Sequence, residues 1–169
     1  MSSTRLPLPS GPEDVVVNTG PLVALGKIGA LDVVGQLPLR FVAPRQVAEE
    51  IEAGARAGHP VVIPPWVTIH ALIGTSILPL GQHVLDAGEA AVIQLAIERS
   101  IPDVCIDEWR GRRAAASVGL RVTGSLGLLG RAKRIGLIPK VSPWVEKLAA
   151  SGAYYHPDLL RDFLSAMGE

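Results

Sequence analysis

The sequence predicts a single α/β domain in which a mainly parallel sheet is covered by helices on both faces. Short aliphatic runs, of which Val15–Val17 is the first, alternate with longer helical segments. This order is typical of strands joined by helical crossovers. Hydrophobic residues make up 48% of the 169 residues and aromatic residues only 4%. The core must therefore consist mainly of Ala, Val, Leu and Ile, as in strands buried on both faces.

The elements begin after a polar lead, residues 1–14, which we expect to be flexible and which shows no signal-peptide pattern. The first strand ends at Asn18-Thr19-Gly20-Pro21, because Gly and Pro interrupt a strand and Pro suits a first helical turn. We then expect a strand at 15–17, a buried helix at 22–34, a strand at 40–43 and an amphipathic helix at 45–56. Residues 57–81 are irregular, with a short strand expected at 66–72.

The second half continues the alternation. We expect a helix at 90–99, a strand at 103–106, a helix at 111–118, a strand at 120–123, and helices at 125–135, 143–150 and 157–167. In parallel sheets, ligand sites form beyond the carboxyl ends of the strands. Asn18, Asp107 and Thr123 fall at such ends. The sequence therefore predicts a polar site at this edge of one domain, residues 15–169.

Composition and charge exclude several classes of protein. No apolar run approaches the roughly 18 residues of a membrane span. The single cysteine, Cys105, excludes an internal disulfide, and we expect a cytoplasmic protein. The net charge is zero, but eight basic and no acidic residues lie between Trp109 and Lys140. This segment either places a basic surface beside an acidic pocket or supplies charge to ordinary solvated helices.

Acidic and amide side chains occur where strands and helices meet the predicted edge. Asn18 follows the first strand, and Glu50 lies on the helix after the second strand. Glu89 begins the central helix, and Asp107 follows a later strand. Converging carboxylates repel one another unless a hard cation with oxygen ligands, such as Mg²⁺ or Mn²⁺, neutralises them. Such an ion can activate water and stabilise charge on a phosphodiester.

Some of these residues also have a purely structural interpretation. Asp86 and Glu89 have the spacing of a helix cap and its capping-box partner, which we favour for Asp86. From spacing alone, Glu50 belongs with Glu49 on a solvated helix face. Asp107 is the strongest candidate, because a carboxylate at the end of an apolar strand needs a partner.

An apolar stripe marks the last predicted helix. Its members are Leu159, Leu160, Phe163 and Leu164. We favour packing of this stripe into the protein's own core. Contact with a second copy in a homodimer, or with a small partner protein, is the alternative.

Several short motifs occur in a fixed order along the chain. They are VVNTGPL at 16–22, DAGEA at 86–90, CIDE at 105–108 followed by Gly111 and Arg112, GLRVTGSLG at 119–127 and LSAMGE at 164–169. Together they resemble the PIN-like superfamily, in particular a prokaryotic branch often catalogued as a domain of unknown function. The resemblance covers nearly the whole chain from Val15, apart from residues 57–81.

The resemblance implies a three-layer α/β/α fold and a metal-dependent ribonuclease site of three or four acidic residues. Many such relatives are toxins of toxin–antitoxin pairs, whose small antitoxin partner blocks the site. Carried over by position, the four catalytic places fall on Asn18, Glu50, Glu89 and Asp107. The expected ligands of Mg²⁺ or Mn²⁺ are Asn18, Glu89 and Asp107, with Glu50 at the same centre. The resemblance also implies auxiliary positions at Thr19, Asp86, Thr123 and Ser125. The hydroxyl groups among them are expected to orient water or phosphate.

Asn18 departs from the family pattern, which has Asp at this strand end. Asn keeps an oxygen that can bind metal but carries no negative charge. We therefore predict a metal-dependent endoribonuclease, the toxin of a toxin–antitoxin pair, with Arg110, Arg112 and Arg113 contacting RNA. The alternative is a catalytically silent PIN-like module that binds RNA or protein. A small-molecule enzyme is not favoured, because no glycine-rich phosphate loop follows the first strand.

Overall fold

The computed structural model describes residues 11–59, 61–74 and 85–169. Residues 1–10 of the predicted lead (1–14) and part of the irregular segment lie outside these residues, whereas Glu13 and Asp14 of that lead belong to the first strand. Within the described residues, five strands form one parallel sheet in the order β3-β2-β1-β4-β5. The strands are β1 (Glu13–Val17), β2 (Leu39–Pro44), β3 (Val67–His70), β4 (Asp103–Cys105) and β5 (Arg121–Thr123). The predicted α/β class with a parallel sheet is confirmed.

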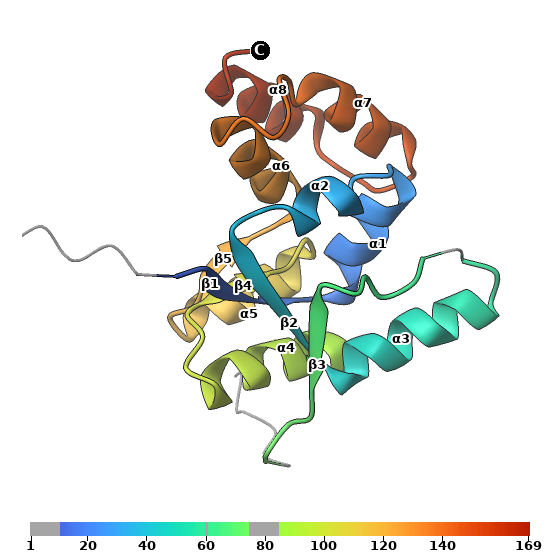
Figure 1. Ribbon diagram of the computed structural model, residues 1–169, viewed down its shortest axis with the longest axis vertical. Helices are drawn as coiled ribbons and strands as arrows, with labels where there is room; N and C mark the ends of the chain where they lie inside the picture. The colour runs from blue at the N-terminus through green and yellow to red at the C-terminus, as the bar shows by residue number, and fades with distance from the viewer. Residues whose placement is uncertain (1–10, 60, 75–84) are drawn as a thin grey trace, which may run out of the picture.

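Helices cover both faces of this sheet and give three layers (Figure 1). In chain order they are α1 (Thr19–Lys27), α2 (Leu31–Gly35), α3 (Arg45–Arg56), α4 (Ala87–Glu98), α5 (Trp109–Ser117), α6 (Ser125–Arg134), α7 (Ser142–Ala150) and α8 (Pro157–Ala166). Figure 1 shows α3, α4 and α5 on one side of the sheet and the other helices on the opposite side. None of the described helices is long and apolar enough to cross a membrane.

The core is aliphatic, as the composition predicts. Val15, Val16 and Val17 are all buried, because helices lie against both faces of β1. Beneath the sheet, α4 contributes Val92, Ile93 and Leu95 without exposing them to solvent. Phe41 is the one buried aromatic side chain in the described part of the chain.

The single helix predicted over residues 22–34 is wrong. The structure has two helices, α1 and α2, separated at Gly29, whose φ of +73° is a left-handed conformation that favours glycine. The amide of Ala30 donates to the carbonyl of Leu25, which closes the end of α1. The apolar pattern continues across the break because both helices bury residues in the same core.

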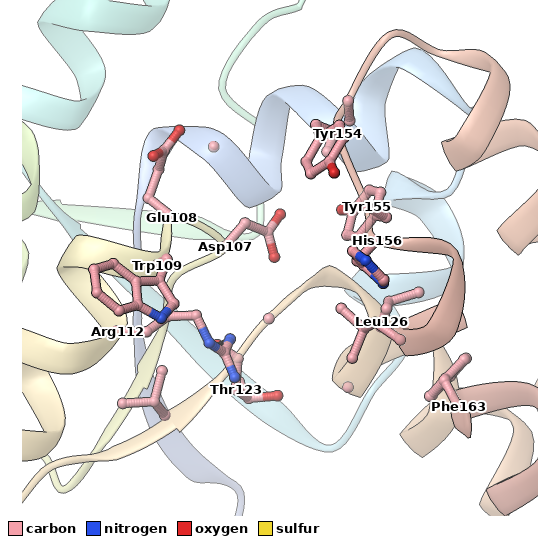
Figure 2. Close-up of a pocket in the computed structure, with 17 residues that line it drawn as sticks. Asp107, Glu108, Trp109, Arg112, Thr123, Leu126, Tyr154, Tyr155, His156 and Phe163 are labelled. Atoms are coloured by element: carbon pink, nitrogen blue, oxygen red, sulfur yellow. Dashed lines mark hydrogen bonds between the residues drawn. The ribbon is translucent and has the colours of Figure 1, made fainter. Parts of the chain in front are cut away.

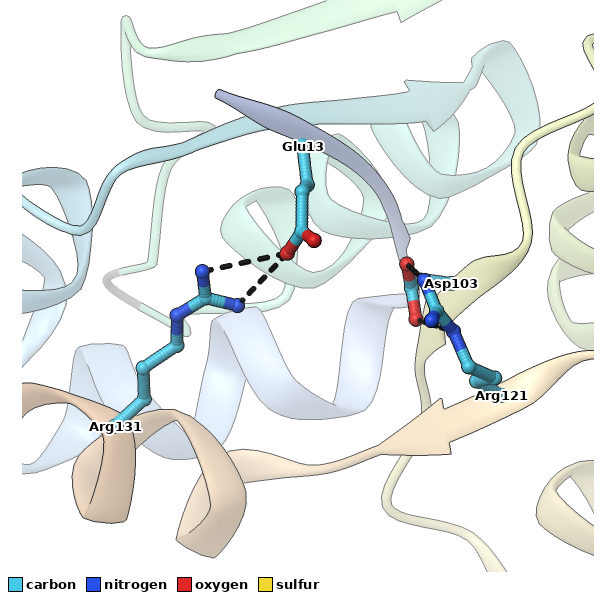
Figure 3. Close-up of polar contacts among 4 residues, drawn as sticks. All are labelled: Glu13, Asp103, Arg121 and Arg131. Atoms are coloured by element: carbon cyan, nitrogen blue, oxygen red, sulfur yellow. Dashed lines mark hydrogen bonds and ion pairs between the residues drawn. The ribbon is translucent and has the colours of Figure 1, made fainter. Parts of the chain in front are cut away.

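Ion pairs hold the amino end of the sheet. Glu13 opens β1 and accepts from Arg131 of α6, while Asp103 opens β4 and accepts two hydrogen bonds from Arg121 of β5 (Figure 3). A third pair joins Lys133 to Glu169 at 2.6 Å. Three of the eight basic residues between Trp109 and Lys140 are thus paired with carboxylates. That segment is not one continuous basic surface.

The order of the strands determines where a ligand can bind. β1 lies in the centre, with β2 on one side and β4 on the other. The chain therefore leaves β1 in one direction to build β2 and β3, and returns on its other side to build β4 and β5. In open parallel sheets the ligand site forms at this reversal, beyond the carboxyl ends of the two central strands. Asn18 follows β1 there, and Asp107 follows β4.

Candidate functional site

Asn18 lies at the centre of the carboxyl edge. Its backbone amide donates to the carbonyl of Cys105 at 3.0 Å, which places the end of β1 beside the end of β4. The side chain is only 4% exposed, and its Oδ1 atom accepts no hydrogen bond from the described residues. Asn18 also precedes α1, but its side chain does not cap that helix. A buried amide oxygen without a donor is costly, so this atom is a good candidate for a ligand contact.

Thr19 and Glu50 join α1 to α3. The hydroxyl of Thr19 donates to Oε2 of Glu50 at 2.5 Å, although 31 residues separate the two in sequence. The half-buried Glu50 carboxylate also lies against Gly88 in α4, where an added Cβ atom would collide with it. Glu50 is therefore directed inward, toward α1 and α4. Its assignment to a solvated helix face, the alternative from spacing, is wrong.

Glu89 is buried at the start of α4 and is 4% exposed. Asp86 and Glu89 form a capping box, which confirms the structural role favoured for Asp86. Burial raises the pKa of the Glu89 carboxyl, and the charges of Asp86, Glu108 and Glu50 raise it further, although the backbone hydrogen bond from Asp86 opposes them. Glu89 thus combines helix capping with a place in a crowded acidic environment.

Asp107 is held by the start of α6. The backbone amide of Ser125 donates to Oδ1 at 2.7 Å, and the Ser125 hydroxyl donates to Oδ2 at 2.6 Å. Tyr155 lines a pocket beside Asp107. Burial, reinforced by the charge of Asp107, raises the pKa of Tyr155 to about 12. The phenol therefore stays protonated at neutral pH and can donate a hydrogen bond.

A pocket of about 770 Å³ opens beside Asp107. Figure 2 shows the Asp107 carboxylate between Trp109 and Arg112 on one side and Tyr154 and Tyr155 on the other. The pocket reaches α1 at Gly20, where an ideal Cβ atom would lie 4.0 Å from Cβ of Asp107. The first turn of α1 therefore borders both Glu50, through Thr19, and Asp107, through Gly20.

A family model described as a PIN domain matches residues 14–169. The chain belongs to the PIN-domain family. No curated protein and no solved structure matches the chain. The parallel sheet and the helices on its two faces agree with the three-layer fold expected for a PIN domain, and the family points to a function of nuclease type.

In this PIN domain the predicted site residues fall into two groups around the first turn of α1. Glu50 and Glu89 form an acidic group on the side of α3 and α4, and Asp107 lies on the side of α6. Asn18 precedes the turn between them. Thr123 lies at the wall of the Asp107 pocket, and its carbonyl accepts from the amide of Ile106 at 3.0 Å.

The three arginines predicted to contact RNA have different environments. Arg112 is half-buried and donates to the carbonyls of Ile106 and Thr123, at 2.8 and 3.1 Å, so it joins the ends of β4 and β5. Arg113 is exposed, with its guanidinium 4.6 Å from the centre of the Trp109 ring. Arg110 is exposed as well. Arg112 therefore has a structural role whether or not it also meets a ligand.

Sequence reasoning missed two groups at this site. Glu108 raises the pKa of Glu89, and its position directly after Asp107 was the available signal. Tyr154, Tyr155 and His156 line the pocket from the loop between α7 and α8. Two adjacent tyrosines in a chain with only seven aromatic residues were a weak signal, but nothing local connects them to Asp107.

The apolar stripe of α8 is partly covered by its own chain. Phe163 and Leu164 pack against the core, and Phe163 lies close to Gly130 of α6. Leu159 is 52% exposed and lines the pocket together with Phe163. None of the residues of α8 is fully buried. The prediction that this stripe packs into the core therefore holds for Phe163 and Leu164 but not for Leu159.

The donor atoms suit a hard cation. Among the described residues, no three His, Cys, Asp or Glu side chains form a ready metal-binding group. The predicted ligand oxygens are the amide oxygen of Asn18, which lacks a partner within the described ranges, and the carboxylates of Glu89 and Asp107. Mg²⁺ commonly takes one or two carboxylates, keeps several waters and completes its shell with substrate phosphate. These oxygens are donors of the type that such an ion takes, and they are divided between the two groups on either side of the first turn of α1.

Proposed function

We propose that this PIN domain is a Mg²⁺- or Mn²⁺-dependent endoribonuclease whose site lies between the ends of β1 and β4. The observation that carries the proposal is the buried Oδ1 of Asn18, which has no hydrogen-bond partner in the described part of the chain and lies at the reversal of strand order. Asn18, Glu89 and Asp107 are the ligands we assign, with Glu50 beside them. Family membership supports the nuclease class.

The charge distribution supports a cation rather than a neutral ligand. In the described ranges, the ion pairs involve carboxylates such as Glu13, Asp14 and Asp103 at the amino end of the sheet, and none involves Glu50, Glu89 or Asp107. Burial and neighbouring carboxylates raise the pKa of Glu89, so its charged form is disfavoured. A divalent ion bound there would offset this cost, activate water and stabilise charge developing on the phosphodiester.

The protein's own residues would position the reactants. Thr19 holds the Glu50 carboxylate in one orientation, and Ser125 does the same for Asp107 with two hydrogen bonds. Tyr155 carries a proton at neutral pH and lines the pocket, so it can donate to a phosphate oxygen. Arg110 and Arg113 are exposed on α5, next in sequence to Trp109 and Arg112 of the pocket wall, and can attract the RNA backbone.

Asp107→Asn tests the proposal, with Asp103→Asn as the matched control. Both aspartates belong to the β4 region, but Asp103 pairs with Arg121 at the amino end of the strand. We expect Asp107→Asn to abolish Mn²⁺-dependent cleavage of a labelled RNA and Asp103→Asn to leave it within about twofold, because surface ion pairs contribute little to stability. Equal activity of all three proteins would disprove the assignment.

A catalytically silent module is the second candidate. Asn in place of Asp at position 18 supports it, because the site lacks one negative ligand. This candidate predicts RNA or protein binding without cleavage by the native chain at any Mn²⁺ concentration. The cleavage assay therefore separates the two candidates.

The toxin of a toxin–antitoxin pair is the biological role we propose, because many PIN domains act with a small antitoxin that blocks the site. Induced expression of the native chain in a bacterial host should arrest growth, whereas Asp107→Asn should not. Normal growth with abundant native protein, in the absence of any antitoxin, would contradict the toxin role but not the nuclease activity.

A further inference from the structure

We propose that Trp109 and Tyr154 form a stacking clamp for unpaired bases across the Asp107 pocket. The inference rests on the proposed ribonuclease function and assigns the residues that would select single-stranded RNA. Both side chains line the pocket, Trp109 from the first turn of α5 and Tyr154 from the loop between α7 and α8. Figure 2 shows them on opposite sides of the Asp107 carboxylate.

Both rings are largely exposed to solvent. Trp109 is 65% and Tyr154 is 88% exposed. Single exposed apolar side chains are common and need no explanation. Here, two large aromatic rings border one pocket next to the proposed catalytic carboxylate. The volume of about 770 Å³ lies within the usual range of ligand pockets.

Arg113 adds a cation to this arrangement. Its guanidinium lies 4.6 Å from the centre of the Trp109 ring, one helical turn further along α5. This cation–π contact favours one orientation of the indole while much of the ring stays open to solvent. A base stacked on the open part of Trp109 would have a positive charge nearby for its phosphate. Aromatic platforms combined with basic side chains are typical of proteins that bind single strands.

An RNA strand agrees with the pocket better than a protein segment does. The wall combines the polar side chains of Asp107, Arg112 and His156 with aromatic rings and with aliphatic side chains such as Leu126 and Leu159. The charged groups interrupt the continuous apolar groove that a docked amphipathic helix needs. Bases in a duplex are stacked on one another and cannot reach such rings. The clamp therefore predicts a preference for unpaired nucleotides.

Binding is best measured in the Asp107→Asn background with Mg²⁺, so that the RNA is not cut. The probe is a short fluorescein-labelled single-stranded oligoribonucleotide, followed by anisotropy. We expect Trp109→Ala and Tyr154→Ala each to raise Kd roughly 5- to 150-fold, which corresponds to the loss of one stacked base. Trp109→Phe and Tyr154→Phe should retain most of the affinity. Val118→Ala, an exposed position at the other end of α5, is the matched control.

A second measurement reports stacking directly. RNA should quench the emission of Trp109, and Trp109→Phe should remove this quenching although Trp66 and Trp144 remain. The same RNA annealed into a duplex should compete poorly. Unchanged Kd in both Ala variants, or equal competition by the duplex, would overturn the clamp. Phe variants as weak as the Ala variants would overturn it too.

The outcomes separate the clamp from the nuclease proposal. If the protein with Asp107 intact cuts RNA and the Ala variants bind and cut single strands normally, only the clamp is wrong. The aromatic pair would then be assigned to contact with a protein. If the Ala variants lose RNA binding but the native protein never cleaves, the clamp stands and the nuclease function is wrong.

Discussion

The hydroxyl of Thr19 donates a hydrogen bond of 2.5 Å to the carboxylate of Glu50. This contact connects the first turn of α1, directly after Asn18, to the middle of α3. It also holds the Glu50 carboxylate against Gly88 of α4. Three helices thus meet at one carboxylate, so the acidic group depends on a contact between segments distant in sequence.

Thr19→Val should destabilise the protein, because the Glu50 carboxylate loses its donor in a half-buried place. Hydrogen bonds to charged groups contribute about 1.5–3 kcal/mol, and partial exposure puts the expected loss near the lower end. Urea unfolding measures this loss. Thr19→Ser keeps the hydroxyl and should unfold close to the native midpoint. If Thr19→Val is as stable as native protein, the bond does not hold the helices together.

Gly111→Ala should displace Glu89. A Cβ atom at Gly111 would lie 2.8 Å from Oε1 of Glu89 and 2.9 Å from Cγ2 of Ile106, and overpacking of this kind typically costs about 1–3 kcal/mol. Gly54→Ala is the matched control, because Gly54 is also helical and its nearest neighbour lies 3.9 Å away.

The two glycine variants should shift stability in opposite directions. Gly54→Ala is expected to stabilise by about 0.5–1 kcal/mol, as alanine usually does in a helix. Gly111→Ala should lower the melting temperature and weaken the response to Mn²⁺. A stabilised Gly111→Ala protein that still responds to Mn²⁺ would show that Glu89 can move aside without loss.

Glu89 should make stability depend on pH. Because the folded pKa of Glu89 is raised above the ordinary value of 4.5, the folded protein binds this proton more tightly than the unfolded chain does. Protonation therefore stabilises the fold to its full extent at pH values below the unfolded pKa. That effect is lost as the pH rises through the folded pKa. Glutamine cannot ionise, so Glu89→Gln does not lose stability in this way. Without metal, the native protein should therefore become less stable relative to Glu89→Gln as the pH rises from acid to neutral.

Thermal unfolding of both proteins over that pH range measures the difference. At neutral pH, saturating Mn²⁺ should make the native protein more stable than Glu89→Gln, because a cation favours the charged carboxylate. A constant difference between native and Glu89→Gln at every pH would show that the pKa of Glu89 is not raised.

Asn18→Asp should strengthen metal binding, because it adds a negative ligand to the site. We expect a Kd for Mn²⁺ lower by on the order of tenfold, which adds about 1.4 kcal/mol at saturation. Without metal the variant should be less stable than native protein, since a charged carboxylate then occupies a position that is only 4% exposed. Titration calorimetry and thermal unfolding with and without Mn²⁺ measure both effects.

Cleavage by the same variant distinguishes two roles for Asn18. If Asn18 limits activity, Asn18→Asp should cut RNA faster, and adding Asp107→Asn should abolish the gain. A native protein that already cuts as fast as Asn18→Asp would show that the amide oxygen is a competent ligand. If neither protein binds Mn²⁺, the metal assignment is wrong.

Local sequence patterns were sufficient for most of the fold. The amphipathic pattern predicted α3 at 45–56 as the structure has it, and Asp103 was correctly expected to begin a strand. The pattern failed at Gly29, because apolar residues continue across the break between α1 and α2. Hydrophobic periodicity reports which side chains are buried, but a turn between two buried helices leaves that signal nearly unchanged.

By itself, the sequence determined the α/β class, the aliphatic core and the placing of Asn18 and Asp107 at strand ends, because these depend on polarity and spacing along the chain. Only the tertiary structure decided that Thr19 bonds Glu50, and that Tyr154 and Tyr155 share a pocket with Asp107. Those contacts join segments far apart in sequence. They depend on how α3 packs against α1 and α4 and on where the loop before α8 lies, and no local pattern encodes such packing.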